Sequence, residues 1–264
     1  MAIAAAEAGA AVVRSRFGTA LSKFDKSATD FATDVDIASE QAILAVLSTH
    51  RPADARLGEE TGGSGDSSSG RTWLIDPLCG TLNFAAQTPM VAVNVALHDH
   101  GGVAVAAVAD PLAAEVYWTD GDAAYVRSGG TDRPVRPAAA SRLVDVNLDP
   151  PFPNDDTFQS VRMLADPEFR ASFLPRVVST SLALAWVAAG RRAAYVTDGH
   201  LRDSVHFASG IALCQAAGCV VTGLRAQPLH TGPGGLVAAA DNQTHAALIG
   251  IIERQFRAGS PQQH

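Results

Sequence analysis

Runs of apolar residues, separated by polar breaks, predict a succession of helices and strands along most of the chain. The Ala-rich segment 1–17 predicts an amphipathic helix, and residues 36–48 predict a second one. The polar segment 18–36 between them predicts a mobile loop or a hairpin. Two apolar runs, 91–97 and 103–108, predict adjacent strands. The first half of the chain is therefore expected to combine helices with a sheet.

The second half continues this alternation after a Pro- and Asp-rich stretch, 138–176, that is less regular. Its elements are predicted as helices at 179–190, 205–218 and 244–257 and as strands at 193–196 and 236–240. The segment 61–71 is low in complexity and predicts a flexible surface loop. We find no internal repeat.

One stretch, WLIDPLCGTLNF, places polar chemistry at the end of a predicted strand. Its apolar start, Trp73 to Ile75, predicts a buried strand that delivers the carboxylate of Asp76. Pro77 is expected to end the strand, Gly80 to permit a tight turn, and Thr81 to begin a helix as its N-cap. A strand that brings an acid to a helix N-terminus is a frequent basis for metal and phosphate sites.

Composition and charge narrow the classes of partner. The 264 residues carry a net charge of −7, with 47% hydrophobic and 18% charged residues. This balance is typical of a globular protein, and the negative charge argues against nucleic acid or an anionic membrane as partner. The three cysteines have no disulfide or zinc-knuckle spacing, and no leader or membrane-spanning run is found. We therefore expect a cytoplasmic protein that acts on a small-molecule substrate.

Four segments together resemble signatures of the inositol monophosphatase family. WLIDPLCGTLNF resembles the family's W-(I/L)-I-D-P-(L/I)-D-G-T-x-N-F, and residues 30–36 resemble its D-L-V-T-x-x-D. Residues 58–60 match its G-E-E, and residues 205–218 resemble its W-D-x-A-A-G-x-x-L-x-x-E-A-G. The resemblance covers essentially the whole chain.

The resemblance implies an α/β fold of the α+β layered kind, the αβαβα sandwich of this family, and a homodimer. It also implies a single domain over residues 1–264. We expect an N-terminal half, 1–137, that carries the metal-site signature, and a C-terminal α/β half, 138–264.

The resemblance also implies roles for individual residues. In this family, clustered carboxylates hold two or three Mg²⁺ ions that polarise the phosphate and generate a hydroxide. Glu59, Asp76 and the carbonyl of Leu78 match the ligands of the first metal ion. Asp36 and Thr81 match the pair that positions the attacking water.

Substrate-binding positions are implied at Gly80, Thr81, Ser179 and Thr197. Ser179 falls in a run that reads Val-Ser-Thr-Ser where the family has Gly-Ser-Ala-Ala. Thr197 stands where the family has an acidic residue that contacts the sugar. Hydrolysis of inositol phosphate by the family's usual two-metal route is therefore not expected.

The chain departs from the family at two ligands of the second metal ion. Cys79 stands in place of the second Asp of the signature, and His206 in place of the Asp of the later motif, with Asp203 nearby as a rival ligand. Two hard oxygen ligands are thus replaced by a thiol and an imidazole, which removes most of what Mg²⁺ prefers. The resemblance implies that both side chains surround one ion position, about 3–5 Å apart.

This departure leads to the first hypothesis, a catalytic Cys-His dyad. Cys79 would be the nucleophile, His206 the base and Asp76 the residue that orients the imidazole. The expected reaction is acyl or amide transfer, cyclisation or hydrolysis through a thioester, in a specialised biosynthetic pathway. No cofactor would be required.

Other readings of the same residues stay open. The chain could be a metal-dependent phosphatase of a small phosphate monoester that uses Mg²⁺ at the first metal position, or a non-catalytic binding homologue. Cys79, His206, Asp76 and Glu59 together also offer ligands that Zn²⁺ accepts. In the plainest reading Cys79 is a tolerated small residue and His206 is structural.

Overall fold

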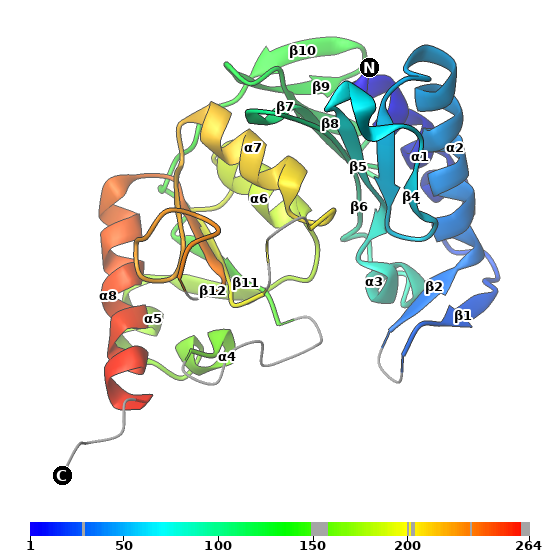
Figure 1. Ribbon diagram of the computed structural model, residues 1–264. Helices are drawn as coiled ribbons and strands as arrows, with labels where there is room; N and C mark the ends of the chain where they lie inside the picture. Colours follow the sequence, from blue (N-terminus) through cyan, green and yellow to red (C-terminus); the bar gives the residue numbers. More distant parts are fainter. Residues whose placement is uncertain (28–29, 149–157, 200, 202–203, 233, 260–264) are drawn as a thin grey trace.

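The computed structural model describes residues 1–27, 30–148, 158–199, 201, 204–232 and 234–259. In these residues, helices and sheets alternate in five layers, which Figure 1 shows from right to left. The expected α+β layered αβαβα sandwich is confirmed. The sheet of the first half ends at Pro134 and that of the second half begins at Leu143. The single domain over 1–264, with halves 1–137 and 138–264, stays a prediction.

The larger sheet contains eight strands in the order β10-β9-β8-β7-β6-β5-β3-β4. Only β3 and β5 are parallel neighbours, and the other pairs are antiparallel. The strands are β3 (Ala55–Gly58), β4 (Gly62–Ser64), β5 (Thr72–Cys79), β6 (Ala92–Asp99), β7 (Gly102–Asp110), β8 (Glu115–Thr119), β9 (Ala124–Ser128) and β10 (Thr131–Pro134). The predicted pair at 91–97 and 103–108 corresponds to β6 and β7.

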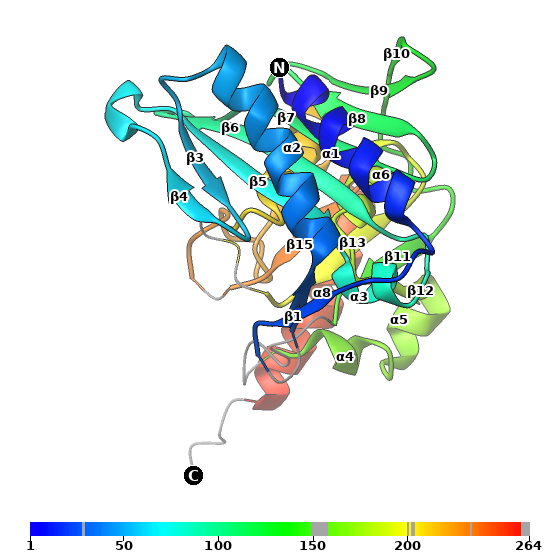
Figure 2. The same cartoon turned by 90° about the vertical axis from the view of Figure 1, so that its right-hand side faces the viewer.

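Helices α1 (Ala2–Arg16) and α2 (Asp34–His50) cover the outer face of this sheet, side by side in Figure 2. Their small residues allow a close approach. A Cβ added at Gly9 would lie 2.8 Å from Ser39 Oγ and 2.9 Å from Ile43 Cδ1, so the crossing requires a glycine. Ile43 is completely buried in the core that the two helices form with the sheet.

Helices α6 (Leu182–Ala188) and α7 (Ala208–Ala217) form the middle layer, between the two sheets. Both are almost wholly apolar, as expected for helices buried on more than one side. A Cβ at Gly210 would lie 2.7 Å from Leu184 Cβ, so glycine again permits the contact between the helices. The turn before α7 meets the end of β5, which positions the site described below.

The smaller sheet contains β11 (Leu143–Val146), β12 (Leu174–Val177), β13 (Ala194–Thr197), β14 (Val220–Thr222) and β15 (Leu236–Ala239). Their order is β12-β11-β13-β15-β14, with β12, β11 and β13 parallel and the other pairs antiparallel. The outermost layer consists of α4 (Ser160–Met163), α5 (Pro167–Ser172) and α8 (Asn242–Gly259). The stretch 138–176 thus holds four short elements, although residues 149–157 lie outside the described part.

The segment 18–36 contains a hairpin, because β1 (Lys23–Asp25) pairs antiparallel with β2 (Phe31–Thr33). This confirms the hairpin alternative. The expectation of a loop throughout 61–71 was wrong, since β4 and the 3₁₀ turn η1 (Ser67–Ser69) lie within it. In β4, Gly63 pairs with Leu57 and Gly62 pairs with Gly58. Because glycine has no side chain, these positions give no hydrophobic pattern that would predict a strand.

Two expectations for the central stretch were also wrong. Pro77 does not end the strand, because β5 continues to Cys79 with a register shift against β6 between Asp76 and Cys79. A proline is tolerated at such an irregularity, where no regular ladder bond is lost. Thr81 is not the N-cap of α3 (Thr81–Ala85), since Gly80 takes that position at φ +96°. Within the described residues, no helix has the length and apolar character needed to cross a membrane.

Candidate active site

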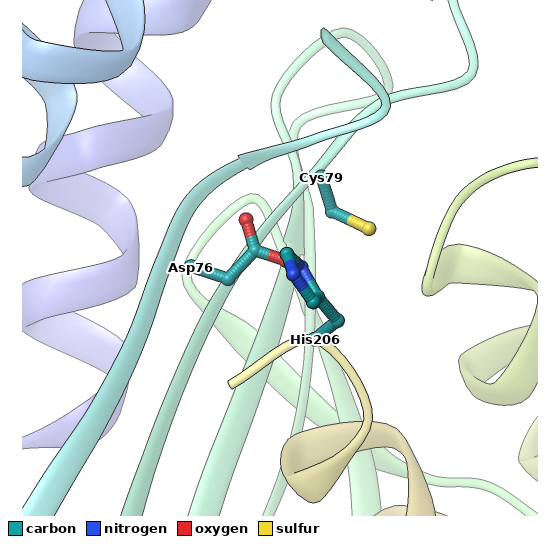
Figure 3. A group of neighbouring side chains, drawn as sticks. All are labelled: Asp76, Cys79 and His206. Carbon is teal, nitrogen blue, oxygen red and sulfur yellow. The ribbon is translucent and has the colours of Figure 1, made fainter. Parts of the chain in front are cut away.

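The bulged end of β5 carries the centre of the candidate site. Asp76 and Cys79 project from it, and His206 approaches from the turn before α7 (Figure 3). One ligand atom from each of these three residues lies within 4.8 Å of the others. The predicted proximity of Cys79 and His206, which are far apart in the sequence, is therefore found in the structure.

Asp76 is completely buried, yet within the described part of the chain a single one of its oxygens has a hydrogen-bond partner. Oδ2 accepts a hydrogen bond from Asn94 Nδ2 at 3.1 Å and lies 2.8 Å from His206 Nδ1. Oδ1 is buried without a hydrogen-bond partner among the described residues. Burial opposes ionisation of Asp76, but the charge of His206 and these hydrogen bonds hold its pKa below the ordinary value. A buried carboxylate with a bare oxygen is suited to a cation.

Glu59 adds a second carboxylate beside Asp76. It follows β3 and lies with Oε2 3.9 Å from His206 Nδ1, while Lys26 Nζ donates to its Oε1 at 2.9 Å. Burial, and then the negative charge of Asp76, raise the pKa of Glu59 to about 8. The protein's own charges therefore do not fully compensate two neighbouring carboxylates, and a metal ion would relieve their repulsion.

Cys79 does not have the properties expected of a nucleophile. Its Sγ accepts a hydrogen bond from the backbone N–H of Ser181 at 3.2 Å. Burial, and then the negative charge of Asp76, raise the pKa of the thiol to about 11. The reactive thiolate is therefore disfavoured rather than stabilised by the protein's own groups.

His206 does not have the properties expected of a base. Burial alone would lower its pKa, but the charge of Asp76 and the hydrogen bond to it hold the pKa well above the usual range. A protonated imidazole cannot accept a proton from a thiol. The protonation states of both residues thus oppose the expected Cys-His dyad.

Asp36 and Thr81 form the hydroxyl–carboxylate pair that the sequence predicted. Thr81 Oγ1 donates to Asp36 Oδ1 at 2.9 Å and lies 3.1 Å from the carbonyl of Leu78. Asp36 also closes the capping box at the start of α2, because its Oδ2 accepts from the N–H of Thr33 at 2.8 Å. Burial raises the pKa of Asp36 to about 6. The catalytic roles of both residues stay predictions.

Gly80 and Ser179 lie next to each other, as expected for two parts of one site. A Cβ at Gly80 would lie 3.2 Å from the carbonyl of Ser179, and Asn83 Nδ2 donates to that carbonyl at 2.9 Å. Thr197 lies elsewhere, at the end of β13, where it is buried and its hydroxyl accepts from the N–H of Gly199 at 3.1 Å. A substrate role for Gly80, Ser179 or Thr197 stays a prediction. Asp203 lies outside the described residues.

Sequence reasoning missed Glu40, which holds the turn that carries Glu59. Glu40 is completely buried, and its carboxylate accepts from the backbone N–H groups of Glu60 and Thr61, both at 2.9 Å. A Cβ at Gly58 would lie 2.5 Å from Glu40 Oε1, so this glycine leaves the space for the carboxylate. The sequence did contain a sign of this role: Glu40 stands seven residues before Leu47, on the face of α2 that is buried, where a charged residue requires a partner.

Asn94 and Ser181 were missed as well. Asn94 Nδ2 donates to Ser181 Oγ at 2.8 Å as well as to Asp76, so the two residues link β6 to the start of α6 behind the site. Asn94 is the one polar residue in the apolar run Val91 to Leu97. A polar residue in a buried strand is informative, because it requires a partner.

Comparison with known proteins identifies the family. The sequence profile described as the inositol monophosphatase family matches residues 1–256. The chain is 30% identical over 236 residues to inositol-1-monophosphatase of Caulobacter vibrioides, covering 88% of this chain and 90% of that protein. It is 32% identical over 237 residues to Nus factor SuhB of Pseudomonas aeruginosa, covering 87% and 85% of the two chains. Among solved structures, SuhB of Bartonella henselae has a TM-score of 0.84 at 24% identity, with 96% of each chain covered.

These matches correct two expectations. The first was Cys-His transfer or hydrolase chemistry without phosphatase activity, whereas the similar proteins of Caulobacter vibrioides and Mycobacterium leprae are named inositol-1-monophosphatases. The second was that no cofactor is required, whereas this family depends on metal ions. Both expectations were based on the residue types of Cys79 and His206 alone. They did not take into account that burial and the charge of Asp76 determine the protonation states of these two residues. The chain belongs to the inositol monophosphatase family.

Proposed function

We propose that this protein is a metal-dependent phosphatase that hydrolyses a small phosphate monoester. The observation that carries the proposal is the pair of carboxylates of Glu59 and Asp76. Asp76 keeps one oxygen without a hydrogen-bond partner among the described residues, and the pKa of Glu59 is raised to about 8 by burial and by Asp76. Two such carboxylates provide a binding site for a divalent cation.

The donors at this position fit Mg²⁺. Glu59 and Asp76 offer carboxylate oxygens, and Leu78 offers a carbonyl that lies 3.1 Å from Thr81 Oγ1. Mg²⁺ prefers such oxygen ligands and retains several of its waters. When bound, the ion would polarise the phosphate and lower the pKa of a coordinated water.

The protein's own residues would hold the attacking water. Because Thr81 donates its one hydroxyl proton to Asp36, the oxygen of Thr81 is free to accept a hydrogen bond from a water. Asp36 is fixed by Thr33, and this rigidity would keep the hydroxyl in one orientation. The pair would therefore orient the water and take up part of its developing charge.

The proposal is tested by phosphate release from a panel of small phosphate monoesters, inositol 1-phosphate and hexose phosphates among them. Activity should require Mg²⁺, be abolished by EDTA and return when Mg²⁺ is restored. Asp76→Asn should lower kcat/KM by about 100-fold or more. Glu60→Gln removes a carboxylate one residue from Glu59 and serves as the matched control, with activity close to that of the wild type.

Two results would overturn the proposal. One is the absence of phosphate release from every ester with Mg²⁺, Mn²⁺ or Zn²⁺ in a correctly folded sample. The other is full activity in Asp76→Asn. The homodimer and the cytoplasmic location stay predictions, and sedimentation of the purified protein would test the first.

A further inference from the structure

The cluster of Asp76, Cys79 and His206 contains donors of three kinds. An oxygen, a sulfur and a nitrogen converge from the end of β5 and the turn before α7 (Figure 3). Their ligand atoms all lie within 4.8 Å of one another. In a tetrahedral zinc site, bonds of about 2.0–2.3 Å place the donors roughly 3–4 Å apart, so small side-chain movements would suffice.

This donor set does not suit Mg²⁺. Mg²⁺ requires an octahedral shell of oxygens, whereas thiolate and imidazole are ligands that Zn²⁺ and similar ions favour. Three protein ligands of these types also leave a fourth position of a tetrahedral ion free for water or a phosphate oxygen. The cluster therefore differs in chemistry from the oxygen ligands of Glu59 and Leu78.

Surrounding residues hold two of the three donors in place. The backbone N–H of Ser181 contacts Cys79 Sγ at 3.2 Å, and Asn94 donates to Asp76 Oδ2 at 3.1 Å. Ser181 and Asn94 are themselves joined by a 2.8 Å hydrogen bond. Such outer contacts orient metal ligands before the ion binds. Asp76 also has a second, buried oxygen without a hydrogen-bond partner among the described residues, which leaves it able to bridge two ions.

We propose that Asp76, Cys79 and His206 form a binding site for one Zn²⁺ ion, or for a transition-metal ion of similar preference, beside the proposed Mg²⁺ position. The ion takes the place of the thiol proton of Cys79 and of the proton between His206 and Asp76. Both protons pass to the solvent as the metal binds. Binding can be measured without turnover, so this proposal does not depend on the proposed phosphatase activity.

Cobalt titration of the metal-free protein tests the site. Co²⁺ substitutes for Zn²⁺ and gives a thiolate-to-metal charge-transfer band in the near ultraviolet only when a cysteine binds it. We expect this band to saturate at one ion per chain, to disappear when Zn²⁺ is added and to persist when Mg²⁺ is added. Metal analysis after dialysis against Zn²⁺ should give the same stoichiometry.

Variants identify the ligands. Cys79→Ser is nearly isosteric and should abolish the band, while His206→Ala should weaken Co²⁺ binding by about 100-fold or more. Cys219→Ser is the matched control, because it removes another partly buried thiol and should leave the band unchanged. The double change of Cys79→Asp with His206→Asp should shift the preference from Zn²⁺ towards Mg²⁺. Thermal melting confirms that each variant is folded.

The absence of a charge-transfer band in the wild type would overturn the proposal. A band that survives in Cys79→Ser would overturn it as well. Cobalt binding without phosphate release would support the zinc site and reject the phosphatase function. Phosphate release with Mg²⁺ in a protein that shows no cobalt band would support the phosphatase function and reject the zinc site.

Discussion

Glu59→Gln should make the metal-free protein more stable while it removes binding of Mg²⁺. The reason is that the carboxylate which attracts a cation also repels Asp76 when no cation is present. The pKa of Glu59 is raised from 4.5 to about 8 by burial and by Asp76. Glutamine has nearly the same size and cannot ionise, so it removes this electrostatic cost.

The size of the expected stabilisation follows from the pKa shift of Glu59. Each pKa unit corresponds to about 1.4 kcal/mol, so the cost of ionising Glu59 in the folded state is at most about 5 kcal/mol. The pKa of about 8 already includes the attraction of Lys26, so only the burial of a glutamine amide, about 2 kcal/mol, offsets the gain. We expect a net stabilisation of about 3 kcal/mol near pH 8, which raises the melting temperature by about 6–12 °C.

The pH dependence determines which of the two proteins, wild type or Glu59→Gln, is the more stable. Below about pH 4.5, Glu59 is protonated in both the folded and the unfolded state, so only the cost of burying the glutamine amide remains and the variant should be about 2 kcal/mol less stable than the wild type. As the pH rises towards about 8, the unfolded chain ionises at this position while the folded protein resists, so the wild type loses stability relative to the variant. Asp36, whose pKa is about 6, titrates in both proteins and cancels in the difference.

The assay is thermal unfolding of both proteins in EDTA and in Mg²⁺, at several pH values between about 5 and 8. Mg²⁺ at 100 times its Kd should stabilise the wild type by about 2.7 kcal/mol and the variant very little. Glu60→Gln, which removes the other carboxylate on Lys26, should show no stabilisation in EDTA. Equal melting temperatures for wild type and Glu59→Gln at pH 8, with undiminished stabilisation by Mg²⁺, would refute the reasoning.

Three further outcomes are expected. Glu40→Gln should lower the free energy of unfolding by about 2 kcal/mol in urea titrations and weaken Mg²⁺ binding, because the β3–β4 turn loses a charged acceptor. Thr81→Val should lower kcat strongly with little change in Mg²⁺ affinity, because the Thr81 hydroxyl contacts Asp36 and would hold the water. Equal losses of kcat and of Mg²⁺ affinity would contradict this role. Cys79 in EDTA near pH 7.5 should react with iodoacetamide about 300-fold more slowly than an ordinary thiol, because its pKa is about 11 rather than about 8.5, and denaturation should remove the difference.

The layered fold could be predicted because whole-chain motifs and periodic runs both indicated it. The long apolar runs became β6 and β7, and the helices at both ends of the chain were placed within a few residues. Short elements were harder to predict. β4 consists of two glycines and a serine, and a pattern of hydrophobic residues cannot detect a strand whose pairing depends only on its backbone.

The positions of the site residues could be predicted better than their chemistry. That Cys79 lies beside His206 followed from the matched motifs. Whether the pair acts as a nucleophile and base depends on burial and on the charge of Asp76, and neither can be read from residue types. The same environment that disfavours a free thiolate favours a thiolate bound to a metal ion, because the ion supplies the positive charge that is missing.

The charge of the site explains why a phosphatase here would require metal ions. Four carboxylates and two bases make up the site and the contacts that hold its first metal position; they are Asp36, Glu40, Glu59, Asp76, Lys26 and His206. With all six ionised the net charge is about −2, which would repel a phosphate monoester. Two divalent ions, with the protons of Cys79 and His206 released, bring this region to about 0, so the ions would remove the repulsion of substrate and would also supply the attacking group. Loss of either ion should therefore weaken substrate binding as well as slow turnover.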